Sequence, residues 1–423
     1  MFKTTIIIIT ACLFCSVAQA QQSLVERYNL PQYDCELKNI MEAKKITIIV
    51  PNDSTVVWAN AKRIKENGAR SGIEVTIKTE SQLLKNDFDD NLWIMGPIAG
   101  YSDWNQFDIP LKKSKRSFTI GKFSFKDPSY GFSYASPPSV SPFRLVTSGN
   151  SLNAFERVAN MPSFGFEYVV LKDAVPELIG NGSRFADLSE LKKSLYTTME
   201  SKYYTFMVSK NLNLEDTEKD IAAEIEKYDN HAEAFVKKME LNLPKKKIKT
   251  YIHATQEEIK YFSGFFNALC GGTTHGFVSG DEIHSWKWGG AVEHEANHHL
   301  FNQQVNKMAP TFLSEGIQKW YEYTVKAEAK GSGFQKAIEF VDEDLADIIC
   351  GRGDFFQGDK YYLISGIFTD YLIDTYGLNK FKKLYKYETH ELLTGFEKTY
   401  NKSLSEILGE YKKWLLLKST KDK

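Results

Sequence analysis

Residues 291–300 read AVEHEANHHL, a stretch with three histidines and two glutamates. His294 and His298 are four residues apart, and Glu295 follows the first of them, so the pattern is H-E-x-x-H. Residues at positions i and i+4 lie on one face of an α-helix, one turn apart. Two imidazoles at this spacing can bind one tetrahedral Zn²⁺ ion. The alternative interpretation is a solvated helix that is rich in His and Glu.

Two neighbours of the histidine pair have different expected positions. Glu295 is placed so that its carboxylate can reach a water molecule beside the metal. His299 is rotated on a helix by roughly 100° from His298, so we expect its side chain to point away from the metal. Apolar residues flank the motif on both sides, which favours a packed helix over a surface helix.

A third metal ligand is predicted at Glu315. Residues 312–321 read FLSEGIQKWY, an amphipathic helical pattern that follows Pro310. Two histidines and one glutamate are a usual ligand set of catalytic zinc in hydrolytic enzymes, which leaves the fourth position for water. The alternative is that Glu315 is a carboxylate near a helix N-terminus, stabilised by the helix macrodipole.

These residues resemble the gluzincin metallopeptidases, whose catalytic domains are aminopeptidase-like or thermolysin-like. The resemblance rests on the H-E-x-x-H motif and on residues 313–316, LSEG, and residues 361–366, YYLISG, extend it. It covers roughly residues 248–415. The resemblance implies one Zn²⁺ per chain, bound by His294, His298 and Glu315.

The resemblance also implies catalytic roles. Glu295 is expected to act as the general base that activates the attacking water. Tyr362 matches best the tyrosine that stabilises the tetrahedral intermediate in the family, and Tyr361 is the second choice. For both tyrosines, packing in a half-buried position is the alternative.

The sequence departs from the family at two places. The Gly-Ala-Met-Glu-Asn signature with which aminopeptidases hold a free amine is absent, and residues 282–286 read EIHSW instead. Endopeptidase activity is therefore at least as well supported as aminopeptidase activity. The position of the acid that orients a zinc histidine in thermolysin-like enzymes is occupied by Lys319. Residues 282–286 are expected to form an edge strand on which an extended peptide can dock.

The sequence predicts an α+β fold with several domains. Short apolar runs at residues 45–51, 73–78 and 92–97 predict strands, and residues 57–72 predict a helix, so residues 21–185 are interpreted as an α/β-type accessory domain. Helical patterns over residues 188–208 and 215–241 predict a helical connector at residues 186–247. Residues 248–423 are predicted to hold the catalytic domain, with a small sheet, the H-E-x-x-H helix and a mostly helical C-terminal part.

The N-terminus predicts export. A lysine, an apolar run over residues 6–17 and the sequence Ala18-Gln19-Ala20 form a secretory signal, so residues 1–20 are expected to be removed. The protein is then periplasmic or secreted, and its mature chain is expected to lack a transmembrane helix. The alternative is a lipoprotein anchored at Cys12. The remaining cysteines, Cys35, Cys270 and Cys350, lack ligand spacing and are interpreted as buried small apolar residues.

The charge balance limits the classes of partner that are expected. The chain has 53 Lys and Arg against 54 Asp and Glu, which excludes the strong basic excess of a nucleic-acid binder. The sequence therefore predicts an exported zinc-dependent peptidase that acts on peptide or glycoprotein. One alternative is a catalytically vestigial protein of this fold that binds peptide or glycan. Another is a helical scaffold whose His-rich stretch is only surface, for which no zinc is expected.

Overall fold

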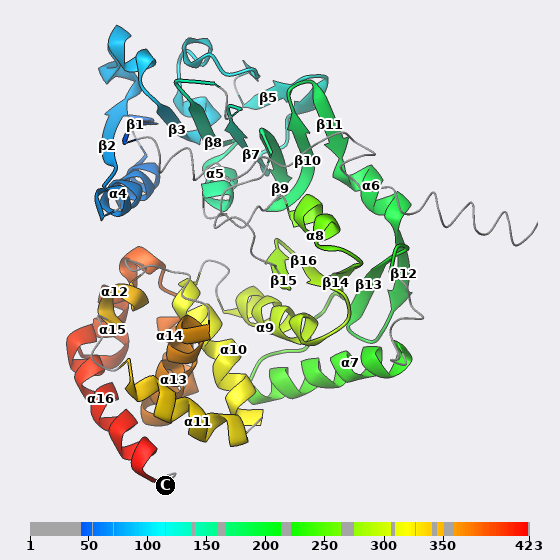
Figure 1. The fold of residues 1–423 in the computed structure, drawn as a ribbon, viewed down its shortest axis with the longest axis vertical. Helices are drawn as coiled ribbons and strands as arrows, with labels where there is room; N and C mark the ends of the chain where they lie inside the picture. The colour runs from blue at the N-terminus through cyan, green and yellow to red at the C-terminus, as the bar shows by residue number, and fades with distance from the viewer. Residues whose placement is uncertain are drawn as a thin grey trace, which may run out of the picture. The chain divides into compact units, whose positions relative to one another are not determined.

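The computed structural model describes residues 44–421, apart from residues 53, 71, 115, 138–139, 160–165, 213–220, 264–274, 306–308, 326, 341–344 and 351–358. The predicted signal segment, Cys12, Cys35 and Cys270 lie outside the described residues, whereas Cys350 is buried as predicted. The fold mixes helices and several sheets, which confirms the α+β class (Figure 1). A membrane span needs a longer and more apolar helix than any in the described part of the chain.

The chain forms two compact units. The first unit is drawn from residues 1–220 and 249–291, and the second from residues 221–248 and 292–423. The chain passes between them three times, at residues 220, 248 and 291, so the units cut across the predicted ranges 21–185, 186–247 and 248–423.

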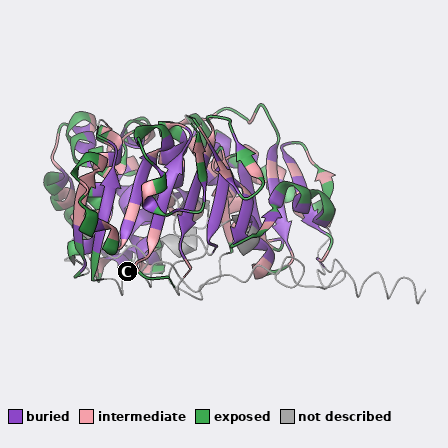
Figure 2. Ribbon diagram, turned by 90° about the horizontal axis from the view of Figure 1, so that it is seen from above, coloured by how far each residue is buried: buried purple, intermediate pink, exposed green. Residues whose placement is uncertain are grey.

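An eight-stranded sheet forms the larger part of the first unit. Its strand order is β11-β10-β9-β7-β8-β3-β1-β2, in which the pairs among β1, β2, β3 and β8 are parallel and the others are antiparallel. The bounds are β1 Lys45–Val50, β2 Glu74–Thr79, β3 Leu92–Pro97, β7 Tyr130–Ala135, β8 Arg144–Gly149, β9 Tyr168–Lys172, β10 Val175–Asn181 and β11 Arg184–Asp187. Most strand residues are buried (Figure 2). The strands predicted at residues 45–51, 73–78 and 92–97 are confirmed.

Helices and a small antiparallel sheet complete this part of the unit. The predicted helix over residues 57–72 is confirmed as α4, Thr55–Arg70, and α5 spans Leu152–Ala159. The small sheet contains β4 Lys112–Ser114, β5 Ser117–Ile120 and β6 Phe123–Phe125. Short 3-10 helices are η1 Glu80–Gln82, η2 Lys85–Asp89, η3 Ile98–Gly100 and η4 Asn105–Phe107. Aromatic residues of the small sheet join one buried cluster with the large sheet.

A five-stranded sheet belongs to the same unit, and it corrects two predictions. Its order is β12-β13-β14-β16-β15, with β12 Tyr196–Glu200, β13 Tyr204–Ser209, β14 Ile248–His253, β15 Gly276–Ser279 and β16 Glu282–Trp286. The edge strand predicted at residues 282–286 is wrong, because β16 pairs with β14 on one side and with β15 on the other. In the described part of this sheet, β15 is the outer strand next to β16.

The long helix predicted over residues 188–208 is also wrong. Helix α6 ends at Leu195, and β12 and β13 follow it as an antiparallel pair. Tyr204, Phe206 and Val208 alternate with less buried residues, and this period of two, with aromatic and β-branched side chains, favours a strand over a helix. Helix α6 (Leu188–Leu195) and helix α8 (Gln256–Ser263) contribute to a core that both sheets share.

A buried polar ladder crosses the five-stranded sheet. Tyr196 Oη lies 2.8 Å from His253 Nδ1, and His253 Nε2 lies 2.9 Å from His284 Nδ1. Glu282 is two residues before His284 on the same strand, and its carboxylate binds Lys192 Nζ at 2.6 Å. The two histidine side chains are completely buried. A buried charge needs partners, and the glutamate has them in this ladder.

Burial keeps both histidines neutral. Desolvation lowers the pKa of His253 well below its usual range and lowers that of His284 to about 4, although the nearby Glu282 carboxylate raises both values. The ring of His284 stacks on Phe277 and on Tyr251, with centroid distances of 4.5 and 4.9 Å. The ladder therefore contains two uncharged imidazoles that are packed in an aromatic layer.

We predict that acidification weakens the first unit. Histidines of the unfolded chain titrate near pH 6.5, about their ordinary pKa, whereas His253 and His284 stay neutral in the fold to much lower pH. The unfolded state then binds more protons, so stability is complete above that pH and is lost as the pH falls below it. Two protons give a slope of up to about 2.7 kcal/mol per pH unit. Urea unfolding at several pH values between 7 and 4.5 measures this slope.

The matched variant is His284→Phe. It keeps an aromatic ring between Phe277 and Tyr251 and removes one titrating group, so the slope should fall by about 1.4 kcal/mol per pH unit. A variant with the wild-type slope would show that protonation of His284 does not cause the acid sensitivity.

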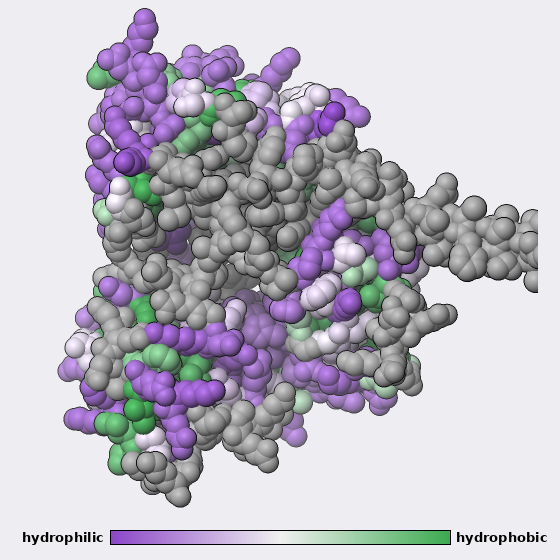
Figure 3. Space-filling model, viewed as in Figure 1, coloured by the Kyte–Doolittle hydropathy of each residue, from purple (hydrophilic) through white to green (hydrophobic). Residues whose placement is uncertain are grey.

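The second unit is helical in its described residues, which confirms the predicted character of the C-terminal part. Its helices are α7 Ile221–Lys238, α9 Gly290–Gln304, α10 Thr311–Val325, α11 Ala327–Ile338, α12 Leu345–Ile349, α13 Asp359–Tyr376, α14 Leu378–Leu384, α15 Leu392–Tyr400 and α16 Leu404–Lys421, with η5 at Thr389–Glu391 (Figure 1). The first two residues of α9 are assigned to the other unit. Leu416 and Leu417 of α16 are exposed. At the lower left of Figure 3, hydrophobic residues lie among hydrophilic ones.

Helices α10 and α13 approach each other closely at two glycines. A Cβ atom on Gly316 of α10 would lie 2.7 Å from the carbonyl oxygen of Ser365 and would also collide with Thr369 Oγ1. A Cβ atom on Gly366 of α13 would lie 2.5 Å from Lys319 Cβ. Side chains at these two positions would push the helices apart, so glycine is required at the crossing.

We predict that Gly316→Ala destabilises the protein by roughly 1–3 kcal/mol, because the added methyl group meets backbone atoms of α13 that cannot move alone. Gly409→Ala is the matched control, because Gly409 lies in α16 and a Cβ there meets nothing within 4 Å. Alanine at this exposed helical position should stabilise the fold by up to about 1 kcal/mol. Chemical denaturation of both variants measures the difference, and equal effects would contradict the proposed crowding.

Candidate metal centre

Three predicted ligands converge in the second unit. His294 and His298 of α9 and Glu315 of α10 each offer an atom, and these atoms all lie within 4.8 Å of one another. The two imidazole Nε2 atoms are 3.1 Å apart, and Glu315 Oε2 lies 3.2 Å from His294 Nε2 and 3.4 Å from His298 Nε2. The three atoms thus form a nearly equilateral triangle.

The local sequence explains this convergence. Val292, Ala296 and Leu300 are buried in α9, which fixes the helix face that presents His294 and His298. Helix α10 begins at Thr311, directly after Pro310, and its buried residues Phe312 and Leu313 seat the helix so that Glu315 lies against the histidine pair.

The triangle fits a small metal ion. Ligand atoms that lie ~2.0–2.1 Å from a tetrahedral Zn²⁺ are about 3.3 Å apart. The three distances between the ligand atoms, 3.1, 3.2 and 3.4 Å, agree with this value. Glu315 Oε2 is buried and receives no well-directed hydrogen bond from the described part of the chain. A buried carboxylate oxygen in that state is costly unless a cation approaches it.

The charges of the three groups depend on one another. Burial by itself would raise the pKa of Glu315, but the positive charge of His298 and His294 outweighs burial and lowers this pKa. Burial would lower the pKa of His294, but the neighbouring carboxylates of Glu315 and Glu322 outweigh it and raise the pKa to about 10. A proton on His294 therefore balances the carboxylates in the absence of a cation, and a bound metal ion would displace that proton.

An outer layer of side chains holds both imidazoles. Glu322 Oε1 of α10 lies 3.4 Å from His294 Nδ1, and Lys319 Nζ binds the other oxygen of Glu322 at 2.7 Å. Ser314 Oγ lies 2.9 Å from His298 Nδ1. With a hydrogen on each Nδ1, the lone pair of each Nε2 is directed at the centre of the triangle, as metal-ligating histidines require.

Glu322 contacts His294 and is a residue of the site that the sequence analysis missed. The resemblance places an acid one turn after Glu315, at the position of Lys319, whereas the acid that contacts His294 lies two turns after Glu315 on the same face of α10. Lys319 orients the new acid through an ion pair. Spacing of seven residues from Glu315 was the available signal, because positions i and i+7 share a helix face.

Helix α7 packs against α9 through two polar contacts. His231 Nε2 lies 2.9 Å from Asn297 Oδ1, and Lys227 Nζ binds Glu293 Oε1 at 2.7 Å. The ring of His231 also packs edge-on against Tyr321 of α10, with a centroid distance of 5.5 Å. Helix α7 therefore contacts both helices that contribute ligands.

Glu295 and Tyr362, the predicted catalytic residues, both lie near His294. Burial raises the pKa of Glu295, and the charges of His294 and His298 oppose this increase, so the carboxylate lies within the field of the site. The Tyr362 ring lies 6.5 Å from that of His294 and is 37% exposed, whereas Tyr361 is buried against Phe312. Tyr362 is the more exposed of the two tyrosines, and burial and then the charge of Glu315 raise the pKa of both.

His299 is not a member of the three-residue group, in agreement with its expected direction. The sequence matches no model of a known protein family, and no curated protein matches it.

We predict that Glu322→Gln lowers zinc affinity by roughly 10–100-fold, because the amide loses the negative charge that holds His294 Nδ1 and pairs with Lys319. Competition with a chromogenic chelator measures the dissociation constant. Glu397→Gln is the matched control, since Glu397 is an exposed glutamate of α15 in the same unit. If both variants bind zinc as tightly as the wild type, Glu322 does not orient His294.

Proposed function

We propose that this protein is an exported zinc-dependent peptidase. The observation that carries the proposal is the triangle of two imidazole nitrogens and one carboxylate oxygen, with Glu295 next to it. Two histidines and one glutamate suit a catalytic zinc, since three protein ligands leave one position open. The layer formed by Glu322 and Ser314 supports this interpretation, because ligating histidines need such partners.

Each residue of the site has a chemical task in this proposal. When bound, zinc supplies Lewis acidity towards a carbonyl oxygen and towards water. Glu295 takes a proton from the attacking water and later delivers it to the leaving amine. Burial raises the pKa of Glu295, which brings the carboxyl closer to neutral pH and suits a group that gains and loses a proton in each cycle.

Tyr362 is assigned to the developing oxyanion. Its side chain lies beside His294 and remains partly exposed, so a substrate can reach it. Burial, and then the negative charges of Glu315 and Glu295, raise its pKa to about 12. The phenol therefore keeps its proton at neutral pH and can donate a hydrogen bond to a carbonyl oxygen as negative charge develops there.

The proposed substrate is a peptide or glycoprotein outside the cytoplasm. This part of the proposal rests on the predicted export signal and on the chemistry of the site. Because the amine-binding signature of aminopeptidases is absent before α9, internal cleavage of peptide bonds is at least as well supported as removal of single N-terminal residues.

We predict that residues 21–423 cleave members of a diverse peptide library, that a chelator abolishes cleavage and that added zinc restores it. Glu295→Gln should bind one zinc ion per chain and lose roughly 10²–10⁴-fold in turnover, because it removes the general base and keeps the metal ligands. Mass spectrometry of the products gives the cleavage positions, and elemental analysis gives the metal content.

Glu397→Gln serves as the control and should cleave at the wild-type rate, since its side chain is exposed on α15. Wild-type turnover in Glu295→Gln would refute the mechanism. A folded, zinc-loaded wild type that cleaves no peptide would favour the alternative of a catalytically vestigial binding protein. A folded protein that binds no zinc would refute both.

A further inference from the structure

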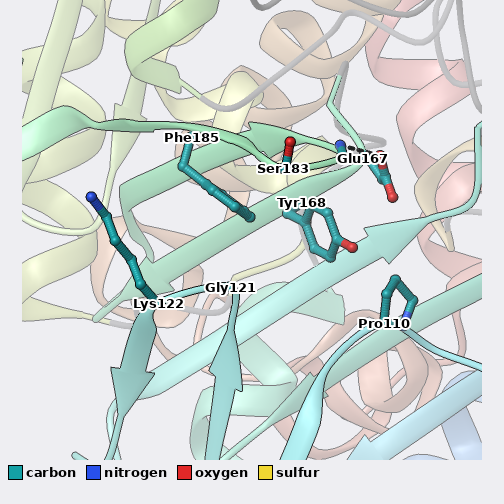
Figure 4. Close-up of a pocket in the computed structure, with 8 residues that line it drawn as sticks. Pro110, Gly121, Lys122, Glu167, Tyr168, Ser183 and Phe185 are labelled. Atoms are coloured by element: carbon teal, nitrogen blue, oxygen red, sulfur yellow. Dashed lines mark hydrogen bonds between the residues drawn. The ribbon is translucent and has the colours of Figure 1, made fainter.

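A cavity in the first unit is separate from the residues of the metal centre. Its volume is about 550 Å³, and it is lined by Pro110, Gly121, Lys122, Glu167, Tyr168, Gly182, Ser183 and Phe185 (Figure 4). Gly121 and Lys122 lie in the turn between β5 and β6, and Gly182 and Ser183 lie in the turn between β10 and β11. Small-molecule sites have volumes of about 300–1,000 Å³, so the cavity has room for a ligand.

The floor of the cavity carries a buried carboxylate. Glu167 is only 5% exposed, and the adjacent Tyr168 is 3% exposed. The backbone N–H of Gly182 donates to Glu167 Oε2 at 2.6 Å, and the backbone N–H of Glu167 donates to Asn181 Oδ1 at 2.8 Å. The side chain of Tyr168, which lies beside Glu167 in Figure 4, also forms a hydrogen bond to the Glu167 carboxylate. The acceptor is therefore held in place before a ligand arrives.

The rim of the cavity is built from two constrained turns. Gly121 and Gly182 have φ angles of 55° and 58°, in the left-handed region that favours glycine. A Cβ on Gly121 would lie 2.9 Å from Phe185 Cε2, so this turn lies directly on the Phe185 ring. That ring also packs on Tyr168, with a centroid distance of 5.7 Å, and it presents an aromatic wall at the cavity.

The two charged groups limit the chemistry of the ligand. Glu167 on the floor repels an anion that Lys122 attracts, and Lys122 on the rim repels a cation that Glu167 attracts, so a singly charged ligand meets a repulsive penalty from one of them. A neutral ring with several hydroxyl groups meets neither penalty, because a hydroxyl group can donate to Glu167 and another can accept from Lys122 Nζ. The C–H face of such a ring can pack on Phe185, which an extended polar ligand would leave uncovered.

We propose that this cavity binds a pyranose ring of a saccharide, with Glu167 as the floor acceptor and Phe185 as the packing surface. The buried acceptor and the rim lysine can bind the hydroxyl groups of one sugar ring, and the aromatic wall can pack against its apolar face. The proposal goes beyond the peptidase proposal and does not depend on it, because all the residues involved belong to the first unit.

The test is saturation-transfer difference NMR on residues 21–423. The probes are methyl glycosides of glucose, galactose, mannose and N-acetylglucosamine, with glycine, lysine and glutamate as zwitterionic and charged comparators. At least one glycoside should show transfer to its ring protons, whereas the amino acids should show none. Titration of that glycoside then gives its dissociation constant.

Glu167→Gln should weaken binding of that glycoside about tenfold or more, because hydrogen bonds to a charged acceptor are stronger than those to an amide. The amide oxygen can still accept the Gly182 N–H, so this variant should fold. Glu74→Gln, at an exposed glutamate of β2, is the matched control and should bind as the wild type does. Three outcomes would overturn the proposal: no glycoside bound, an amino acid bound in preference, or a glycoside bound equally by Glu167→Gln.

Discussion

The close crossing of α10 and α13 is the packing constraint on which the arrangement of the metal centre depends. Gly316 lies directly after Glu315, and it lets α10 pack with its backbone almost against the backbone of α13. Because a helix is stiff over one turn, the position of this contact also sets where Glu315 lies relative to α9. The same crossing brings Tyr362, on the first turn of α13, to the side of His294.

Charge pairing then determines which side chains can lie together in the small volume of the metal centre. Two carboxylates, Glu315 and Glu322, flank His294, and each would be costly to bury without a positive partner. Lys319 balances Glu322, and a proton on His294 or a metal ion balances Glu315. The charges of the site are therefore paired and His298 is buried, which distinguishes the site from a solvated surface helix that is rich in His and Glu.

The two units use histidines in opposite ways. In the first unit, burial keeps His253 and His284 uncharged, and their nitrogens bind each other and a tyrosine. In the second unit, carboxylates surround His294 and favour its charged form. The neighbours of an imidazole, more than its burial, decide whether it is neutral or charged.

Local spacing by itself predicted much of the site. The pair His294 and His298 follows from the helical repeat, and Glu315 follows from the helix after Pro310, because both features depend on residues close in sequence. The strands β1, β2 and β3 were predicted for the same reason. Two predictions failed at β-hairpins: residues 196–209 fold back as the pair β12 and β13, and β16 pairs with the preceding strand β15 as well as with β14. What only the tertiary structure decided is the supporting layer of Glu322 and Ser314, since helix crossings, which no local repeat encodes, determine which side chains meet.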